Sequence, residues 1–322
     1  MSQARSAILL VGGMGTRLHP LTLQTPKPML PVAGVPFTEH QIRKAREAGI
    51  TEIVLATSFK AELFEPYFGD GSAFGIAIKY AVEKEPLGTG GAIRNAANML
   101  SGDGAVAIFN GDVLSSHDLA AQLAFHDEMN ADVTLYLTEV PDARAFGAVE
   151  LDGQNRVLAF NEKMENPPTN IINAGCYIFS RSVFDSIPFG AVVSVERETF
   201  PGLLANGARV LGFVDRSYWL DIGTPAALMA ATRHFLTAES NDGRGNLIHP
   251  TAKIHPTAVV EGASVVGAGA TVGAGARITG SIVGEGAVVG ERATAISSFI
   301  ADVAELAAGS YAEENFLGFL QK

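Results

Sequence analysis

Residues 6–18 read SAILLVGGMGTRL, and residues 26–28 read PKP. The apolar run 7–11 predicts a short buried strand, which the glycines after it bring to an end. Glycine permits positive φ and close approach of a ligand, and successive N–H groups in such a turn can bind an anion. Arg17 adds a bidentate cation, and Lys27 adds a point charge on a loop stiffened by prolines. Together these features predict a cradle for a triphosphate.

The spacing of the glycines excludes two better-known phosphate loops. A P-loop needs a second glycine where this chain has Arg17, counted from Gly12. The dinucleotide-binding pattern needs a third glycine where this chain has Leu18, counted from Gly13 and Gly15. A strand–loop turn without a ligand is the alternative, but such a turn has no need of clustered cations.

The composition bounds the class of protein. A chain of 322 residues, 47% apolar and 18% charged, is long enough for one large and one smaller globular domain. Apolar runs stay well short of the ~20 residues that span a membrane, and the chain enters its first strand at once, so we expect neither a membrane partner nor a signal peptide. The single Cys176 fits a reducing cytoplasm. A net charge of −11 argues against nucleic acid and calls for local cations or a divalent metal beside a polyanionic ligand.

Strand-like and helix-like segments alternate from residue 6 to about residue 240. This alternation predicts a doubly wound α/β sheet, whose ligands lie at the carboxyl ends of the strands. The expected strands are 7–11, 52–56, 77–82, 105–109, 132–137, 148–151, 156–160, 174–179 and 209–213. The expected helices lie near 38–48, 90–100, 119–129 and 196–206.

Two loops that follow expected strands carry candidate ligand-binding residues. Residues 83–91 read EKEPLGTGG and open a helix, so they form either a binding loop or a solvated connection. Asp112 ends the segment IFNGD at 108–112. A carboxylate at this position is a candidate metal ligand, although it could also belong to a turn or cap the helix that starts near Asp118.

Candidate residues for a phosphorylated sugar lie on the next strands. Glu162 and Lys163 are neighbours, so they point to opposite faces of a strand unless a bulge or a strand end intervenes. An exposed ion pair is the alternative. Asn173 can both donate to and accept from hydroxyl groups, or it can simply be a polar residue where a strand starts.

The last third of the sequence contains a further candidate carboxylate and a repeat. Asp221 and Thr224 precede Pro225, so Thr224 can cap a helix that begins at Pro225 while Asp221 binds a ligand. After residue 245, aliphatic residues recur every six positions, which predicts a β-helix of hexapeptide repeats. The repeat positions are Ile248, Ile254, Val260, Val266, Val272 and Ile278, and the register slips by one before Val283 and Val289. His249 and His255 hold equivalent positions, which fits a structural role better than an acyl-transfer base.

The segments at 12–18, 20–22 and 26–32 closely resemble the signature of sugar-1-phosphate nucleotidylyltransferases. The resemblance covers essentially the whole chain. It implies a Rossmann-like doubly wound mixed sheet in a catalytic domain at 1–240, then a left-handed parallel β-helix at 241–322. The segments 85–89, 172–175 and 194–201 look most like those of mannose-1-phosphate guanylyltransferases.

The resemblance also implies the reaction, in which GTP and mannose 1-phosphate give GDP-mannose and pyrophosphate. Mg²⁺ would be held by Asp112 and Asp221. The implied catalytic residues are Arg17, Lys27, Asp112 and Asp221. The implied nucleotide-binding residues are Leu10, Gly12, Gly13, Gly15, Thr16, Glu85, Pro86 and Gly88. The implied sugar-phosphate-binding residues are Gly147, Glu162, Lys163 and Asn173, although the family usually has proline after this lysine and this chain has Met164.

Three alternatives stay open at this point. A sister enzyme could transfer a thymidylyl or uridylyl group to glucose 1-phosphate. A regulatory subunit could bind nucleotide sugars without catalysis, although the cations and carboxylates at the positions named above argue against it. An acyltransferase could act from the β-helix, which we instead expect to join copies of the chain into a homo-oligomer.

Overall fold

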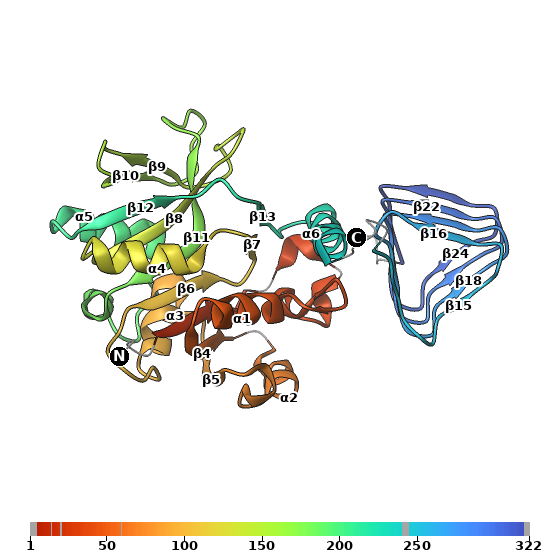
Figure 1. Ribbon diagram of the computed structural model, residues 1–322, viewed down its shortest axis with the longest axis horizontal. Coiled ribbons are helices and arrows are strands. Elements are labelled where there is room, and N and C mark those ends of the chain that lie inside the picture. Colours follow the sequence, from red (N-terminus) through yellow and green to blue (C-terminus); the bar gives the residue numbers. More distant parts are fainter. Residues whose placement is uncertain (1–4, 14, 20, 59, 240–244, 319–322) are drawn as a thin grey trace. The chain divides into compact units, whose positions relative to one another are not determined.

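The computed structural model describes residues 5–13, 15–19, 21–58, 60–239 and 245–318 (Figure 1). The described residues fall into two compact units. The first is made by residues 5–13 and 38–220, and the second by residues 15–37 and 221–318. The expected domain boundary between residues 240 and 241 falls outside the described residues and stays a prediction.

A mixed sheet of nine strands forms the first unit, and each of the nine expected strands is in it. β1 (Arg5–Leu10) pairs in parallel with β4 (Ile50–Thr57) and β6 (Val106–Asn110). The strand order is β10-β9-β11-β6-β1-β4-β5, with β8 between β11 and β12. β11 runs antiparallel to β6, β8 and β9. The other strands are β5 (Ala77–Val82), β8 (Val133–Glu139), β9 (Ala148–Leu151), β10 (Val157–Asn161), β11 (Ile171–Phe179) and β12 (Val210–Val214).

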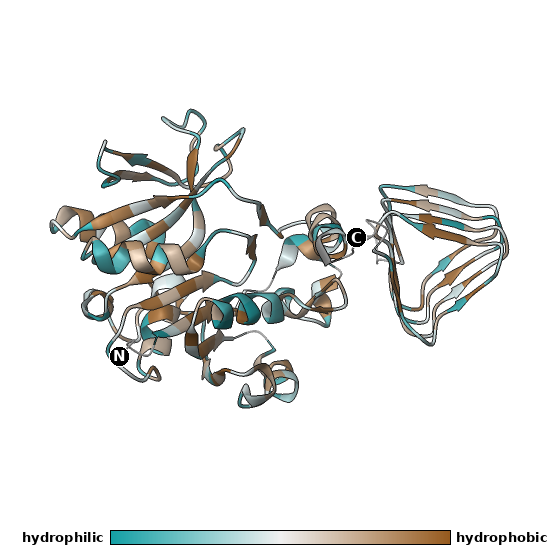
Figure 2. Cartoon of the chain, in the orientation of Figure 1, coloured by the Kyte–Doolittle hydropathy of each residue, from teal (hydrophilic) through white to brown (hydrophobic). Residues whose placement is uncertain are grey.

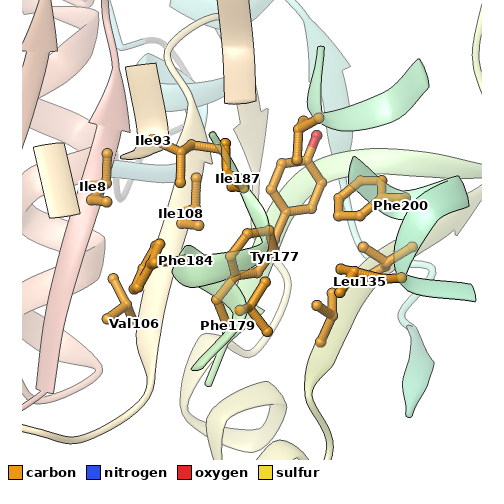
Figure 3. Close-up of a cluster of buried hydrophobic side chains, with 14 of the residues drawn as sticks. Ile8, Ile93, Val106, Ile108, Leu135, Tyr177, Phe179, Phe184, Ile187 and Phe200 are labelled. Carbon is orange, nitrogen blue, oxygen red and sulfur yellow. The ribbon is translucent and has the colours of Figure 1, made fainter. Parts of the chain in front are cut away.

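Helices cover this sheet, because its central strands are apolar on both faces. Ile8 belongs to a large buried cluster with Ile93 and Ile108, which Figure 3 shows together. Ala7 and Leu9 are also fully buried, and they point to the other face because neighbours on a strand alternate. α3 packs on β1 and β4, and α4 packs on β8 and β11. The helices of this unit are α1 (Phe37–Glu47), α2 (Glu65–Phe68), α3 (Gly88–Ala97), α4 (Leu119–Glu128) and α5 (Phe200–Ala205).

Several details of the first unit differ from the sequence-based expectation. The helix expected at 196–206 begins as a π-helical turn, η7 (Val195–Thr199), before α5. β7 (Val113–Ser115) and β13 (Trp219–Asp221) pair in a separate two-stranded sheet that the alternation pattern did not predict. α1 is largely hydrophilic in Figure 2, yet its polar residues Glu39 and Gln41 are buried.

β11 contains a bulge that the sequence did not predict. Asn173 pairs with Leu137 and Tyr177 with Leu135, so the register against β8 shifts between them. Gly175 sits inside this bulge with φ of 76°. A Cβ at Gly175 would lie 2.9 Å from Val113 Cγ2, so this position requires glycine for both its backbone angle and its space. Bulges redirect the side chains beside them, and here the bulge follows Asn173 directly.

The second unit combines an early segment with the helix α6 (Pro225–Glu239) and the β-helix. Thr224 caps α6 as expected, since its hydroxyl oxygen accepts a hydrogen bond from the Ala227 N–H at 3.2 Å. β2 (Pro31–Val32) and β3 (Val35–Pro36) pair with each other, and α6 packs on β2. None of the helices among the described residues has the length and apolarity needed to cross a membrane.

The repeats form a parallel β-helix with three flat sides, which Figure 1 shows as stacked coils. This agrees with the expected left-handed β-helix. Ile248 pairs with Val266, 18 positions on, whereas Val266 pairs with Val283 and Val283 with Ile300, each 17 positions on. The one-residue slip in the sequence therefore recurs in each later rung. The buried hydroxyls of Ser264 and Ser281 accept N–H bonds from the serine one rung on. The strands are β14 (Leu247–Ile248), β15 (Lys253–Ile254), β16 (Val259–Glu261), β17 (Val265–Val266), β18 (Thr271–Val272), β19 (Arg277–Thr279), β20 (Ile282–Val283), β21 (Val288–Val289), β22 (Thr294–Ile296), β23 (Phe299–Ile300), β24 (Glu305–Leu306), β25 (Tyr311–Glu313) and β26 (Phe316–Leu317).

His249 and His255 occupy exposed corners of this coil. Each imidazole Nδ1 accepts a hydrogen bond from the backbone N–H two residues further on, at 3.2 Å. Thr251 and Thr257 then accept N–H bonds from Gly269 and from Gly275 of the next rung. These contacts give both histidines the structural role expected from their repeat positions.

Candidate functional site

Two cations and a carboxylate come together in the second unit. Arg17 Nη2 lies 3.8 Å from Asp221 Oδ2, and Lys27 Nζ lies 3.8 Å from Asp221 Oδ1. The Arg17 side chain is 68% exposed, whereas the Lys27 side chain is only 10% exposed. The guanidinium also lies against Gly223, where a Cβ would approach Arg17 Nη2 to 2.9 Å. Arg17 and Lys27 therefore form one charged group with Asp221, which lies far from both in the sequence.

Gly15 makes this grouping possible. Its φ is 60°, an angle that glycine adopts without strain. A Cβ at this position would lie 2.8 Å from Lys27 Cβ, so a larger residue would displace the lysine. The Gly15 carbonyl accepts a hydrogen bond from Thr22 Oγ1 at 2.9 Å, which ties the loop down. Thr16 begins the short 3₁₀ turn Thr16–Leu18 that presents Arg17.

The end of β1 in the first unit carries the remaining part of the glycine loop. Leu10 is the last strand residue, and Gly12 and Gly13 follow it without positive φ. A Cβ at Gly12 would lie 2.6 Å from Ser58 Oγ, whose hydroxyl donates to the Gly12 carbonyl. Gly13 is exposed with open space around it. Close packing thus explains Gly12, while the exposed backbone at Gly13 is accessible to a ligand.

Asp112 lies in a turn between β6 and β7. It does not cap the following helix, because Asp118 performs that role by accepting the Ala121 N–H at 2.9 Å. Gln41 of α1 holds the turn through two hydrogen bonds. Its Nε2 donates to the Asn110 carbonyl at 2.8 Å and to the Val113 carbonyl at 3.2 Å. One buried side chain therefore fixes the backbone on both sides of Asp112.

A buried polar cluster extends this support. Lys44 Nζ donates to the Ser115 carbonyl at 2.7 Å and to His117 Nδ1 at 2.9 Å. His117 then donates from Nε2 to Gln122 Oε1 at 3.1 Å, and its ring stacks on Tyr136. Burial, followed by the charge of Lys44, lowers the pKa of His117 to about 3. Burial likewise lowers the pKa of Lys44 to about 8.

The loop expected to bind nucleotide packs on another part of the first unit. Gly88 and Gly91 touch the backbone of residues 191–193, where a Cβ would lie 2.6 Å from the Val193 carbonyl oxygen and 2.4 Å from the Ala191 carbonyl oxygen. Gly88 and Gly91 thus allow the close approach of two backbone segments of the chain itself. Glu85 and Pro86 remain exposed.

The residues expected to bind a phosphorylated sugar gather around the bulge in β11. The backbone N–H of Asn173 donates to the Gly147 carbonyl at 2.9 Å, and a Cβ at Gly147 would lie 3.1 Å from Glu162 Oε2. β10 ends at Asn161, so Glu162 and Lys163 follow a strand end. Beyond a strand end, neighbouring side chains need not point to opposite faces of the sheet. Lys163 is exposed.

Trp219 joins these segments. Its indole N–H donates to the Ala174 carbonyl at 3.1 Å, and its ring meets Phe146 edge to face at 5.3 Å. Gly147, Glu162 and Asn173 therefore share one corner of the first unit, with Trp219 packed beside it.

The two carboxylates expected to hold a metal belong to different units. Groups of three or more metal-binding side chains do not occur among the described residues. Each carboxylate by itself offers the oxygen ligands that a hard cation takes, because Mg²⁺ is commonly held by one or two carboxylates together with substrate phosphates and water.

Comparison with known proteins identifies the family. The model of the nucleotidyl transferase family matches residues 6–238. The chain belongs to this nucleotidyl transferase family. Nucleotidyltransferases of this kind generally use a divalent metal. A second model, described as the GMPPB C-terminal domain, matches residues 244–317.

Relatives of the family share large parts of the chain. A mannose-1-phosphate guanylyltransferase from Mycobacterium tuberculosis is 58% identical over 68% of this chain and 61% of its own length. A mannose-1-phosphate guanyltransferase from Gibberella zeae is 35% identical over 76% of this chain and 68% of its own length. The chain thus spans only about two thirds of the length of these relatives.

Solved structures show the same fold. HddC from Yersinia pseudotuberculosis is 29% identical, with a TM-score of 0.62 over 71% of this chain and 99% of that chain. The same protein complexed with GMP-PN gives a TM-score of 0.61 over the same shares of the two chains. A Bacillus anthracis protein of 24% identity shares the fold, with a TM-score of 0.67 over 74% of this chain and 97% of that chain.

Gln41, Lys44, Ser58 and Trp219 support the site residues but escaped the sequence analysis. Gln41 and Lys44 lie three positions apart on α1, where they look like an ordinary polar face. The burial of Gln41 and the hydrogen bonds of both side chains reveal that this face holds a turn. Trp219 had a signal, since it stands two positions before Asp221.

The buried His117 predicts a specific loss of stability in acid. Its pKa is about 6.5 in an unfolded chain and about 3 in the folded protein. Between these values the unfolded chain binds the proton and the folded one does not, so the free energy of unfolding falls as the pH falls. The loss is about 1.4 kcal/mol for each pH unit below about 6.5. His117→Gln should therefore reduce the difference in unfolding free energy between about pH 7 and about pH 4.5 by about 2.5 kcal/mol.

Urea unfolding followed by the fluorescence of Trp219, the single tryptophan, measures this difference in the first unit. The matched control is His249→Gln, an exposed histidine of the β-helix, which should leave the difference unchanged. Equal pH dependence in wild type and His117→Gln would contradict the assignment.

Proposed function

We propose that this protein transfers a guanylyl group from GTP to mannose 1-phosphate, giving GDP-mannose and pyrophosphate. The observation that carries the chemistry is the pair of cations, Arg17 and Lys27, grouped on Asp221 in a chain of net charge −11. The relatives named mannose-1-phosphate guanylyltransferase support the choice of base and sugar. The related HddC structure complexed with GMP-PN supports a guanine nucleotide as well.

The proposed reaction is a single in-line displacement. A phosphate oxygen of mannose 1-phosphate attacks the α-phosphorus of GTP, the bond from that phosphorus to the bridging oxygen breaks, and pyrophosphate leaves. Such a reaction needs positioning and charge stabilisation and no covalent intermediate. Lys27 stabilises charge on the transferred phosphate, and Lys163 orients the sugar phosphate.

The other residues bind the two substrates. Arg17 and the backbone N–H groups of residues 12–16, of which residue 14 lies outside the described residues, hold the β- and γ-phosphates. Leu10, Glu85, Pro86 and Gly88 line the nucleotide. Gly147, Glu162 and Asn173 contact the hexose. Asp112 and Asp221 would hold Mg²⁺, which would supply positive charge to offset that of the α-phosphate.

A grid of nucleoside triphosphates and sugar 1-phosphates, followed by pyrophosphate release, tests this function. GTP with mannose 1-phosphate should give the highest kcat/KM. Higher values for dTTP or UTP with glucose 1-phosphate would instead indicate a thymidylyl- or uridylyltransferase. Binding of nucleotide sugars without turnover of any pair would indicate a regulatory subunit.

The metal assignment predicts that Asp112→Asn and Asp221→Asn each lower kcat by at least about 10², comparable to the loss of one preorganised charge contact. The thermal midpoint should change little in both variants. Mg²⁺ titrations of pyrophosphate release provide the measurement. Asp185→Asn is the control, because this carboxylate is 81% exposed and lies in an ion pair with Arg94. Near-normal Mg²⁺-dependent turnover in either ligand variant would refute a shared metal.

We also propose that the β-helix joins copies of the chain into a homo-oligomer, and that the enzyme works in the cytoplasm. The flat sides of a parallel coil favour assembly, and every cation in a phosphate-type motif lies before residue 240. A chain ending at residue 239 should keep measurable turnover while its mass by light scattering falls to that of a monomer. An unchanged number of subunits would refute the assembly role, and complete loss of turnover would mean that the coil helps to build the active site.

A further inference from the structure

Glu196 lies in the segment 194–201, whose similarity to one group of relatives has so far received no physical explanation. Its side chain projects from η7, a π-helical turn. Such turns are rare and frequently occur at functional sites. The carboxylate is partly buried and accepts hydrogen bonds from two directions.

On one side the carboxylate holds the end of the loop expected to bind nucleotide. Thr89 Oγ1 donates to Glu196 Oε2 at 2.9 Å, and Ser194 Oγ donates to the same oxygen at 3.1 Å. Thr89 Oγ1 also accepts the Val195 N–H at 2.9 Å. Glu196 therefore ties η7 to the loop at 85–89.

On the other side the carboxylate reaches the residue expected to bind the hexose. Tyr177 Oη donates to Glu196 Oε1 at 3.4 Å, and Asn173 Nδ2 donates to Tyr177 Oη at 3.0 Å. The Gly175 N–H donates to Asn173 Oδ1 at 3.2 Å. Tyr177 is fully buried, and burial raises its pKa well above the usual value, so its hydroxyl keeps its proton.

These bonds have a fixed direction. An ionised carboxylate can only accept hydrogen bonds, so the Tyr177 hydroxyl must point its proton toward Glu196. The Tyr177 oxygen is then an acceptor, and the Asn173 amide must turn its NH₂ group toward it. The Asn173 oxygen faces the Gly175 N–H as a result. One N–H and one lone pair of the amide remain, each in a defined direction.

We propose that Glu196 is a positioning residue that fixes, through Tyr177, the orientation in which the Asn173 amide meets the hexose. This inference rests on the proposed function, in which Asn173 contacts the sugar. Hexose 1-phosphates that differ in the configuration of one hydroxyl present donors and acceptors differently. An amide held in one orientation distinguishes these sugars, whereas an amide that can rotate by 180° and exchange its oxygen and NH₂ positions distinguishes them less well.

The test is the ratio of kcat/KM for mannose 1-phosphate to that for glucose 1-phosphate, at saturating GTP. Glu196→Met removes the acceptor and should lower this ratio about threefold to tenfold, the effect of one hydrogen bond. Tyr177→Phe should lower it equally, and the double variant should lower it no further. Glu196→Gln keeps an acceptor for the Tyr177 hydroxyl without the charge, so its ratio should stay within about twofold of wild type.

The matched control is Glu198→Met, the same change two residues on in the same turn. Its carboxylate accepts the Ser194 N–H and is exposed, so the ratio should not change. Equal falls in kcat/KM for both sugars in Glu196→Met and Tyr177→Phe, or additive effects in the double variant, would overturn the proposal. A loss in Glu196→Gln as large as that in Glu196→Met would overturn it too.

A binding measurement separates this proposal from the proposed function. The shift in thermal midpoint caused by GDP-mannose is compared with that caused by GDP-glucose, which requires no turnover. A wild type that produces no GDP-mannose would contradict the function. The positioning role still stands if the wild type shows a larger thermal shift with GDP-mannose than with GDP-glucose, and if this difference disappears in Tyr177→Phe but persists in Glu196→Gln. Unchanged discrimination in both variants refutes it.

Discussion

The parallel pairing of β1 with β4 and β6 is the constraint on which the first unit depends. Strands that run the same way end at the same edge of a sheet, and in α/β folds that edge binds the ligand. Here it brings the backbone after Leu10 beside the turn that carries Asp112. The Gly111 N–H donates to the Leu10 carbonyl at 3.0 Å, and a Cβ at Gly111 would approach that oxygen to 2.3 Å. The two loops can meet this closely only because glycine stands there.

Side chains with no part in the chemistry hold these loops in place. A loop at a strand end has backbone groups without partners in the sheet, and a buried group left unsatisfied costs about 1–3 kcal/mol. Gln41 and Lys44 satisfy carbonyl groups around the turn of Asp112, as described above. Both donors come from one face of α1, so the position of this helix on the sheet and the shape of the turn depend on each other.

The sequence predicted the elements better than their connections. Nine strands could be placed because apolar runs recur between turn residues, and the coil could be placed because Ile248 and its successors repeat every six residues. The bulge at Gly175 was not predictable, because a glycine inside an apolar run does not indicate which way its neighbours turn. The grouping of Arg17 and Lys27 with Asp221 was also hidden, since about two hundred residues separate them in the chain. The resemblance to a family named these residues, but their distances follow only from the fold.

The β-helix differs from the sheet in how its length is determined. Each rung touches only the rung before and the rung after it, and the serine hydroxyls bond from one rung to the next in the same way. A sheet covered by helices cannot lose a central strand without losing its core. A coil can gain or lose one complete rung and leave the remaining contacts as they were. Over evolutionary time this part of the chain can therefore lengthen or shorten in whole-rung steps while the sheet keeps its number of strands.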